Sequence, residues 1–283
     1  MSKVIVFGAF GQLGQCLQQV TKQHAAIAFI FLPEDKANIL DAAGLEVIFE
    51  EHQPAYCINC AAYTAVDKAE EEEELARQVN RDGVENLAKL CSKYDTTLIH
   101  ISTDFVFAGT GNEPLTEEDA TTPVNAYGLT KLEGEQAVTR LLERYFILRT
   151  SWLYSEYGNN FVKTMIRLGR EREELKVIWD QVGTPTYAMD LAAAIYQIVS
   201  SQSKAYGTYH YSNEGLTSWY DFTKAIFELK QISARVIPVR NWEYATKAKR
   251  PAFTVLDKTK IKSNLTLDIP HWRESLKVCL QNL

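Results

Sequence analysis

Two neighbouring stretches, Thr97–Phe107 (TLIHISTDFVF) and Tyr127–Lys131 (YGLTK), decide the fold and the chemistry predicted for this chain. The first is predicted to form a buried strand that ends in a hydroxyl pair and an acid. The second is predicted to begin a helix, and its spacing places Tyr127 and Lys131 on one helical face. Because an ammonium beside a phenol favours the phenolate, Lys131 is expected to lower the pKa of Tyr127 from about 10. Thr103 is expected to donate a second hydrogen bond to the same substrate oxygen, which suits a carbonyl that accepts hydride.

The spacing Tyr-x-x-x-Lys occurs again at Tyr220 and Lys224, where it has a different interpretation. No strand ending in Ser or Thr closely precedes this second copy. Thr217 or Ser218 instead provides an N-cap for an ordinary helix. The strand upstream therefore marks Tyr127 and its lysine as the candidate catalytic pair.

A glycine loop near the start of the chain predicts a dinucleotide-binding fold. The apolar run Val4–Phe7 is typical of a buried parallel strand, and Gly8, Gly11 and Gly14 follow it. Such glycines allow a tight turn, a close approach to a pyrophosphate and packing of the next helix on the strand. That helix, expected from about Gln12, offers free N–H groups to phosphates. We therefore predict an α/β protein with a doubly wound parallel (Rossmann) sheet.

Two more segments are expected at the cofactor edge of this sheet. A second strand, about 26–32, is followed by Glu34, Asp35 and Lys36. An acid there favours NADH through the ribose 2′-hydroxyl, whereas a base leaves NADPH open, so both cofactors stay possible. A third strand, 55–59, runs into small residues up to Thr64, which either lie against the cofactor or allow tight packing of strand and helix.

Composition and charge exclude several classes of protein. A length of 283 residues allows one large α/β domain with a smaller cap. The formal net charge of −6 provides no basic surface for nucleic acid or an anionic membrane. No uncharged apolar run reaches the roughly 18 residues that cross a bilayer. Residues 1–3 precede the first strand and are too few for a signal peptide, so we expect a cytoplasmic protein.

The potential metal ligands do not form a recognisable site. Five scattered cysteines favour reduced thiols over a disulfide framework. Cys57 and Cys60 are expected on opposite faces of a strand, where they cannot share a metal. The acidic run Glu70–Glu74 falls in a helix predicted over 67–93, so its carboxylates are expected to splay over a solvated surface.

The chain is expected to divide into two parts. Residues 1–150 are predicted to form the dinucleotide-binding domain, with 176–200 returning to it. Residues 151–175 and 201–283 are predicted to form a smaller α/β substrate-binding cap, because the elements after residue 207 are shorter and less periodic. The segment 247–251 is the most basic patch of that part. It either holds a substrate phosphate or is plain surface charge.

Taken in order, the motifs resemble the extended short-chain dehydrogenase/reductase family and, within it, the dTDP-4-dehydrorhamnose reductases. The resemblance covers residues 3 to about 260. The motifs that carry it are Gly8-x-x-Gly11-x-x-Gly14, Asn59-x-Ala61-Ala62-Tyr63-Thr64, Ser102-Thr103-Asp104, Tyr127-x-x-x-Lys131-x-x-Gly134-Glu135, Arg149-Thr150-Ser151-Trp152, Gly158-Asn159-Asn160-Phe161, Asp180-Gln181-x-Gly183-x-Pro185-Thr186 and Arg250-Pro251.

The resemblance implies a reaction, a cofactor and a set of site residues. The reaction is reduction of the C4 ketone of dTDP-4-dehydro-β-L-rhamnose to dTDP-L-rhamnose, a precursor of cell-surface polysaccharide, with hydride from NADPH or NADH. Tyr127 would donate the proton, assisted by Thr103, and Lys131 would lower its pKa and bind the nicotinamide ribose. The implied substrate contacts are Thr103, Asp104, Trp152, Asn160 and Arg250. The implied cofactor contacts, besides Tyr127 and Lys131, are Gly8, Phe10, Gly11, Gln12, Leu13, Gly14, Asn38, Ile39, Ala61, Ala62, Tyr63 and Thr64.

The resemblance also bears on metals and on assembly. Some members form a dimer bridged by magnesium through acidic side chains, but the matching positions here are Gln15 and Met189. No metal site is therefore expected, and the chain is expected to be a monomer or a homodimer.

Other functions remain to be weighed against the reductase. A sugar-nucleotide dehydratase needs an Asp-Glu pair after the threonine, whereas Asp104 is followed here by Phe105, which transfers no proton. A 4-epimerase or another nucleotide-sugar 4-ketoreductase shares the fold. A non-catalytic NAD(P)-binding subunit, resembling the β subunit of methionine adenosyltransferase, is the alternative from another class. The intact Thr103, Tyr127 and Lys131 favour catalysis.

Overall fold

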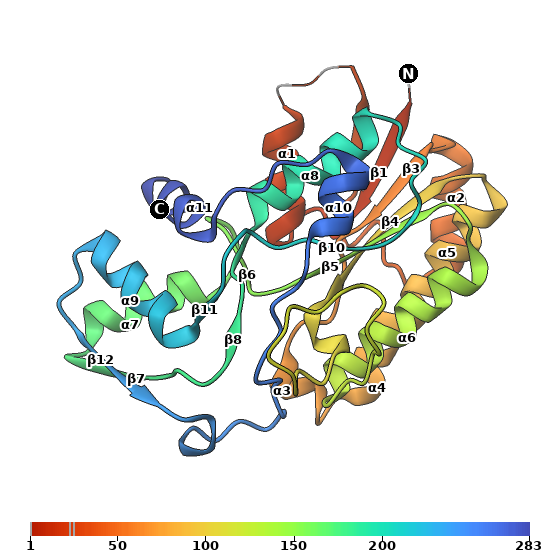
Figure 1. Ribbon diagram of the computed structural model, residues 1–283. Helices are drawn as coiled ribbons and strands as arrows, with labels where there is room; N and C mark the ends of the chain where they lie inside the picture. Colours follow the sequence, from red (N-terminus) through yellow and green to blue (C-terminus); the bar gives the residue numbers. More distant parts are fainter. Residues whose placement is uncertain (1, 23, 25) are drawn as a thin grey trace.

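The centre of the protein is a six-stranded parallel sheet (Figure 1), seen in a computed structural model that describes residues 2–22, 24 and 26–283. Its strands run in the order β10-β5-β4-β3-β1-β2, and each neighbouring pair is parallel. Their bounds are β1 Lys3–Phe7, β2 Ala28–Phe31, β3 Tyr56–Asn59, β4 Thr97–Thr103, β5 Tyr145–Thr150 and β10 Gly207–His210. The predicted α/β class with a Rossmann sheet is confirmed.

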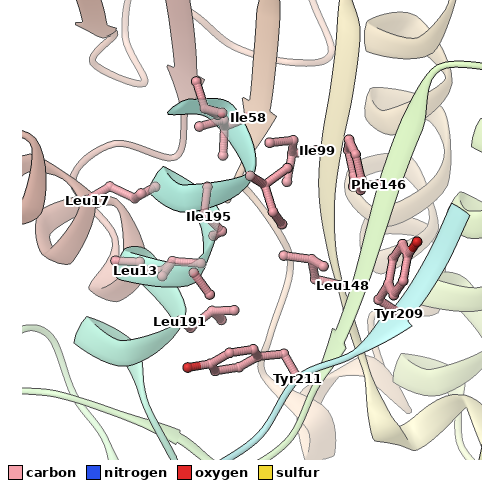
Figure 2. Packing of buried hydrophobic residues seen from close by; sticks show 14 of the residues in the cluster. Leu13, Leu17, Ile58, Ile99, Phe146, Leu148, Leu191, Ile195, Tyr209 and Tyr211 are labelled. Atoms are coloured by element: carbon pink, nitrogen blue, oxygen red, sulfur yellow. The ribbon is translucent and has the colours of Figure 1, made fainter. Parts of the chain in front are cut away.

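Helices cover both faces of this sheet, because successive residues of each strand point to opposite sides. On one face, α1 (Gln12–Thr21) and α8 (Ala188–Ser200) pack Leu13, Leu17, Leu191 and Ile195 against strand residues that include Ile58, Ile99 and Leu148 (Figure 2). On the other face, α2 (Ala42–His52), α5 (Gly83–Lys93) and α6 (Ala126–Leu141) meet the next residues of the same strands, such as Leu98. The carboxyl ends of the strands are thereby left at one open edge.

The segment 67–93, predicted as one helix, is interrupted in the structure. It forms α3 (Val66–Ala69), α4 (Glu73–Arg77), the π-helical turn η1 (Gln78–Asp82) and α5. The residues of the acidic run are exposed, as predicted, and two of them also have tertiary partners. Glu70 accepts a hydrogen bond from the Ala126 N–H at 2.8 Å, and Glu72 accepts one from the Tyr63 hydroxyl at 2.6 Å. No local pattern indicates these tertiary partners, and both acids lie in the break between α3 and α4.

A second group of elements forms a cap at one side of the main sheet (Figure 1). Strands β7 (Glu174–Ile178) and β12 (Arg235–Val239) pair in parallel, and α7 (Phe161–Glu171), α9 (Trp219–Lys230) and α11 (Trp272–Gln281) pack with them. Short strands join the layers: β6 (Leu153–Tyr154) pairs with β9 (Thr186–Tyr187), and β8 (Val182–Gly183) with β11 (Thr217–Ser218). The remaining elements are η2 (Asp104–Val106), η3 (Asn241–Glu243) and α10 (Thr259–Leu265).

The observed layers differ from the predicted division of the chain. Strand β10 lies beside β5 in the main sheet, and Ile261 of α10 joins the core beneath it, although 201–283 was assigned to the cap. Strand β7 belongs to the cap, although 176–200 was assigned to the sheet, whereas α8 does pack on α1. The last third of the chain supplies β10, which pairs with the edge of β5, and α10, which completes the core under β10. The chain therefore crosses between the layers.

The second Tyr-x-x-x-Lys copy lies on α9 in the cap. The Ser218 hydroxyl accepts a hydrogen bond from the Asp221 N–H at 3.0 Å, so Ser218 is the N-cap of that helix. The interpretation of Tyr220 and Lys224 as part of an ordinary capped helix is confirmed. The expectation that no strand ending in Ser or Thr closely precedes this copy is wrong, because the two-residue strand β11 ends at Ser218.

The five cysteines are free thiols. Burial raises the pKa of Cys16 to about 12 and that of Cys60 further still, so both remain protonated at neutral pH. Within residues 2–22, 24 and 26–283, no three His, Cys, Asp or Glu side chains gather as a metal site would require. Over the same residues, none of the helices combines the length and the apolar character that spanning a bilayer demands.

Candidate active site

The candidate site lies where β4 ends and α6 begins. Thr103 is the last residue of β4, and the side chain of Asn125 caps α6 by accepting a hydrogen bond from the Gly128 N–H at 2.7 Å. Gly128 allows this approach, since a Cβ there would lie 2.2 Å from the Phe105 carbonyl oxygen. The Tyr127 ring then meets the Phe105 ring edge to face, with 5.8 Å between centroids. Close packing of α6 on η2 therefore carries Tyr127 to the end of the strand.

Asp104 is the least satisfied polar group of this site. Thr103 Oγ1 donates to its Oδ1 at 3.1 Å. Among the described residues, the buried Oδ2 atom has no hydrogen-bond partner. Burial raises the pKa of Asp104 to about 6, against the lowering effect of the Thr254 and Thr103 hydroxyls. A buried acid with a free oxygen beside Thr103 and Tyr127 is suited to hydrogen-bond a ligand.

The expected lowering of the Tyr127 pKa is wrong for this arrangement. Burial raises the pKa of Tyr127 to about 12, with Asp104 raising it further and the Thr103 hydroxyl opposing. Lys131 is not among the groups that shift this pKa, and its Nζ atom donates to the Ile101 carbonyl oxygen at 2.7 Å. Desolvation of the phenolate is therefore the dominant effect on the pKa of Tyr127.

A cavity of about 380 Å³ opens at the carboxyl ends of β1, β2 and β3. Gly8 has φ of +69°, and a Cβ there would lie 2.5 Å from the Ala61 nitrogen, so only glycine fits. Gly14 plays the predicted packing role, since its Cβ would meet the Gly8 carbonyl oxygen at 2.4 Å. The predicted cofactor residues that line the cavity are Gly8, Phe10, Gly11, Asn38, Ile39, Ala61 and Ala62, and Glu34 lines it too.

Other predicted cofactor residues have structural partners. Leu13 is buried in the core under the sheet, so only its backbone is available to a ligand. The Tyr63 N–H donates to Asn80 Oδ1 at 2.9 Å, and its hydroxyl donates to Glu72. Thr64 is exposed. The buried Asn80 also donates to Thr130 Oγ1 at 3.1 Å and so ties this loop to α6.

Gln12 and Asn160 join the glycine loop to the loop that follows β6. Asn160 Nδ2 donates to Gln12 Oε1 at 2.8 Å, and Gln12 Nε2 donates to the Leu153 carbonyl at 3.2 Å. Asn160 also caps α7, because its Oδ1 accepts from the Lys163 N–H at 3.1 Å. Both polar atoms of the Asn160 amide are thus occupied within the protein, and its place in the structure is a junction between the two loops.

Trp152 and Arg250, predicted to contact substrate, are each held by another side chain. The Trp152 ring stacks on Trp219 with 3.5 Å between centroids and an interplanar angle of 9°. Trp152 also has φ of +46°, in the left-handed region. Arg250 donates to both carboxylate oxygens of Asp67, at 3.1 and 2.7 Å, and thereby lowers the pKa of Asp67. Lys247 likewise pairs with Glu71, so two of the basic side chains of segment 247–251 are held by acids of α3 and the turn after it.

Sequence reasoning gave no role to several buried polar residues that lie under the site. Glu135 of α6 accepts hydrogen bonds from Arg149 and from the Ser102 hydroxyl, the latter at 2.5 Å. Asn59 and His100 form a chain to Lys131. The available signal was a polar residue within an otherwise apolar strand, which requires a buried partner.

Comparison with known proteins shows the family to which this chain belongs. Residues 2–283 match the family described as "RmlD substrate binding domain". The chain belongs to this family. The resemblance to the dTDP-4-dehydrorhamnose reductases is also confirmed, since several proteins of that name are 38–43% identical to this chain over nearly their whole length.

Three similar proteins illustrate the range. The dTDP-4-dehydrorhamnose reductase of Sinorhizobium fredii is 43% identical over 284 residues, which cover 97% of this chain and 95% of that protein. The spore coat polysaccharide biosynthesis protein SpsK of Bacillus subtilis is 39% identical over 281 residues, 99% of this chain and 98% of SpsK. The crystal structure of dTDP-4-dehydrorhamnose reductase from Bacillus anthracis in complex with NADP is 40% identical, with a TM-score of 0.95 and full coverage of both chains.

Proposed function

We propose that the protein catalyses the NAD(P)H-dependent reduction of the C4 ketone of dTDP-4-dehydro-β-L-rhamnose to dTDP-L-rhamnose. One observation carries the proposal: Thr103, Asp104 and Tyr127 gather at the end of β4, at the edge of the sheet that also holds the glycine-loop cavity. In open α/β sheets this edge is where ligands bind. The names of the full-length relatives supply the substrate.

The residues of the cavity fit a nicotinamide dinucleotide. Gly8 leaves space that a Cβ would fill, and Gly11 precedes the first turn of α1, whose N–H groups and dipole favour phosphate. Asn38, Ile39, Ala61 and Ala62 would line the path of the adenosine half. When bound, the reduced cofactor supplies the hydride that attacks C4. The Bacillus anthracis relative was crystallised with NADP, which supports this choice of cofactor.

The proton goes to the ketone oxygen as the hydride reaches C4, so that one C–H and one O–H bond form. Tyr127 would donate that proton, and Thr103 would hydrogen-bond the same oxygen. A phenol with a raised pKa is fully protonated at neutral pH, as a general acid must be before the reaction. Asp104, with its free Oδ2, would accept or donate a hydrogen bond to the sugar. Lys131 would bind the nicotinamide ribose.

The cap would hold the nucleotide sugar over this centre. Trp152 and Trp219 form a stacked aromatic wall between the main sheet and the cap, and Trp152 would pack on the sugar. Arg250, fixed by Asp67, would face the substrate side of the site. The proposal includes a division into a dinucleotide-binding part and a substrate-binding cap, a cytoplasmic location, and a monomer or homodimer as the assembled state.

The test is an absorbance assay with purified protein, NADPH or NADH, and enzymatically generated dTDP-4-dehydro-L-rhamnose. Oxidation that requires both the protein and the sugar is the expected result, and it also reveals the preferred cofactor. A protein that binds the cofactor but never oxidises it would refute the reductase and favour a regulatory subunit. If the protein oxidised the cofactor only with a different 4-keto-6-deoxy sugar, that sugar would be the substrate instead.

A further inference from the structure

A hydrogen-bonded series of three buried polar side chains runs from β3 to α6, the helix that carries Tyr127. Asn59 and His100 lie opposite each other on the neighbouring parallel strands β3 and β4, and Lys131 projects from α6. Asn59 Nδ2 is 3.2 Å from His100 Nδ1, and His100 Nε2 is 3.5 Å from Lys131 Nζ. None of the three side chains is more than 2% exposed. Polar atoms so deeply buried must match donors with acceptors.

One backbone group sets the direction of the hydrogen bonds along these three side chains. The Ala61 N–H is 3.0 Å from the side chain of Asn59. Because an N–H can only donate, the Asn59 atom that faces it must be Oδ1, which leaves Nδ2 toward His100. That amide N–H can also only donate, so His100 Nδ1 accepts and carries no proton. The ring is then neutral, and its proton lies on Nε2, because a cationic ring would place N–H groups on both nitrogens.

The Nε2–H group of His100 faces the side-chain nitrogen of Lys131. An uncharged amine has a lone pair that accepts this hydrogen bond, whereas an ammonium has none. The lysine also donates to the Ile101 carbonyl oxygen at 2.7 Å, which either form can do. We propose that Asn59 and His100 are positioning residues for Lys131: oriented by the Ala61 N–H, they present a donor to the lysine and favour its uncharged form.

The other groups around Lys131 do not reverse this preference. Cys60, in the loop after β3, is a protonated thiol because burial raises its pKa. Glu135, one turn further along α6, is occupied by Arg149 and Ser102. Tyr127, one turn earlier, is a neutral phenol at neutral pH. Burial lowers the pKa of Lys131 to about 8, with Glu135 and Cys60 opposing. The charge of Lys131 therefore changes close to neutral pH.

This arrangement has a consequence for cofactor binding, and that part rests on the proposed function. An ammonium holds ribose hydroxyls as a donor with three N–H groups, whereas the amine form already receives the His100 N–H. Affinity for NADPH or NADH should therefore fall as the pH rises through the pKa of Lys131. The chain of side chains ends at a backbone amide, so its effect is on the charge of Lys131.

The first experiment reads the His100 ring directly by nitrogen-15 NMR of the cofactor-free protein, assigned by comparison with His100→Phe. We expect a neutral ring with its proton on Nε2. In Asn59→Asp the carboxylate accepts from both Ala61 and the ring, so the proton should move to Nδ1. A wild-type ring protonated on Nδ1, a cationic ring at neutral pH, or an unchanged tautomer in a folded Asn59→Asp protein would overturn the proposal. The wild-type measurement tests it even if the variant fails to fold.

The second experiment measures NADPH and NADH affinity by fluorescence between about pH 6 and 9. Asn59→Asp should move the midpoint of the affinity loss upward by about one pH unit, because His100 Nε2 then accepts from the ammonium. The new carboxylate also raises the pKa of Lys131 by its charge alone. Comparison of the double variant Asn59→Asp/His100→Phe with the single variant His100→Phe measures that part of the shift. Equal shifts with and without His100 would overturn the role of the ring. Absence of any nucleotide binding would instead refute the proposed function and leave the tautomer result standing.

Discussion

Glu135 and Arg149 form a buried ion pair directly beneath the strand end that carries Thr103. Arg149 donates to Glu135 through Nη2 at 2.7 Å and through Nε at 3.0 Å, and the side chains are only 7% and 5% exposed. The Ser102 hydroxyl donates to the same carboxylate, and the guanidinium lies 5.1 Å from the centre of the Phe107 ring. The pair thus joins α6, which carries Tyr127, to β4 and β5.

The first prediction concerns this pair. Glu135→Gln leaves the Arg149 charge buried without its counter-charge, which should lower the free energy of unfolding by about 3–5 kcal/mol. Urea unfolding checks the value. The matched control is Glu171→Gln, which breaks an exposed pair with Arg167 and should cost about 0.5 kcal/mol or less. Equal costs for the two variants would mean that the buried pair contributes little.

Gly128→Ala should separate packing from chemistry. The added Cβ would lie 2.2 Å from the Phe105 carbonyl oxygen, so α6 must shift and Tyr127 must leave its position by the Thr103 hydroxyl. A misplacement of about 1 Å costs on the order of 100-fold in turnover. Steady-state kinetics check this, with Gly111→Ala as control, because a Cβ at that position meets nothing within 4 Å. Full activity in Gly128→Ala would show that the helix start tolerates the shift.

Tyr127→Phe removes the proposed proton donor. Turnover should fall by about 100-fold or more, while nucleotide affinity stays close to that of the wild type. Tyr220→Phe changes the same residue type at the same spacing in the cap and should leave turnover unchanged. An active Tyr127→Phe enzyme would exclude Tyr127 as the general acid.

Asp104 should make stability depend on pH in a recognisable direction. Its pKa is raised by burial from 3.8 to about 6, so the folded state binds this proton more tightly than the unfolded state. Stability from this group is present below about pH 4 and is lost as the pH rises through 6, on the order of 3 kcal/mol in all. Asp104→Asn carries no charge there, so its stability relative to wild type should increase over that pH window. A pH-independent difference in urea unfolding would contradict the buried, raised acid.

Two substitutions of Asn160 distinguish its bond to Gln12 from its role as the N-cap of α7. Asn160→Ala removes both, and it should lower stability by about 1 kcal/mol and raise the KM for the cofactor. Asn160→Asp keeps the acceptor that caps α7 but loses the donor to Gln12 and to the Ser155 carbonyl. It should therefore retain the cap yet raise the KM. If KM rises only in Asn160→Ala, the bond to Gln12 does not affect the glycine loop.

Sequence alone determined the parts that depend on local periodicity. The apolar runs at Val4–Phe7 and Thr97–Thr103, the glycines between strand and helix, and the four-residue step from Tyr127 to Lys131 each specify an element or a shared face within a few residues. Parallel strands then bring their carboxyl ends to one edge, so the position of the site in the sheet was also predictable.

Which polar groups meet depends on how distant segments of the chain pack. Glu70 accepts a hydrogen bond from the first N–H of α6, Asp67 holds Arg250 and Asn160 holds Gln12, across separations of 56, 183 and 148 residues. The place of β10 in the main sheet was decided in the same way. The pKa of Tyr127 depends on the balance between burial and nearby charge, and the spacing of Tyr127 and Lys131 in the sequence indicates only the charge. The physical reason is common to all of these: periodicity is a property of the chain, whereas desolvation and the choice of hydrogen-bond partner exist only once distant segments are packed together.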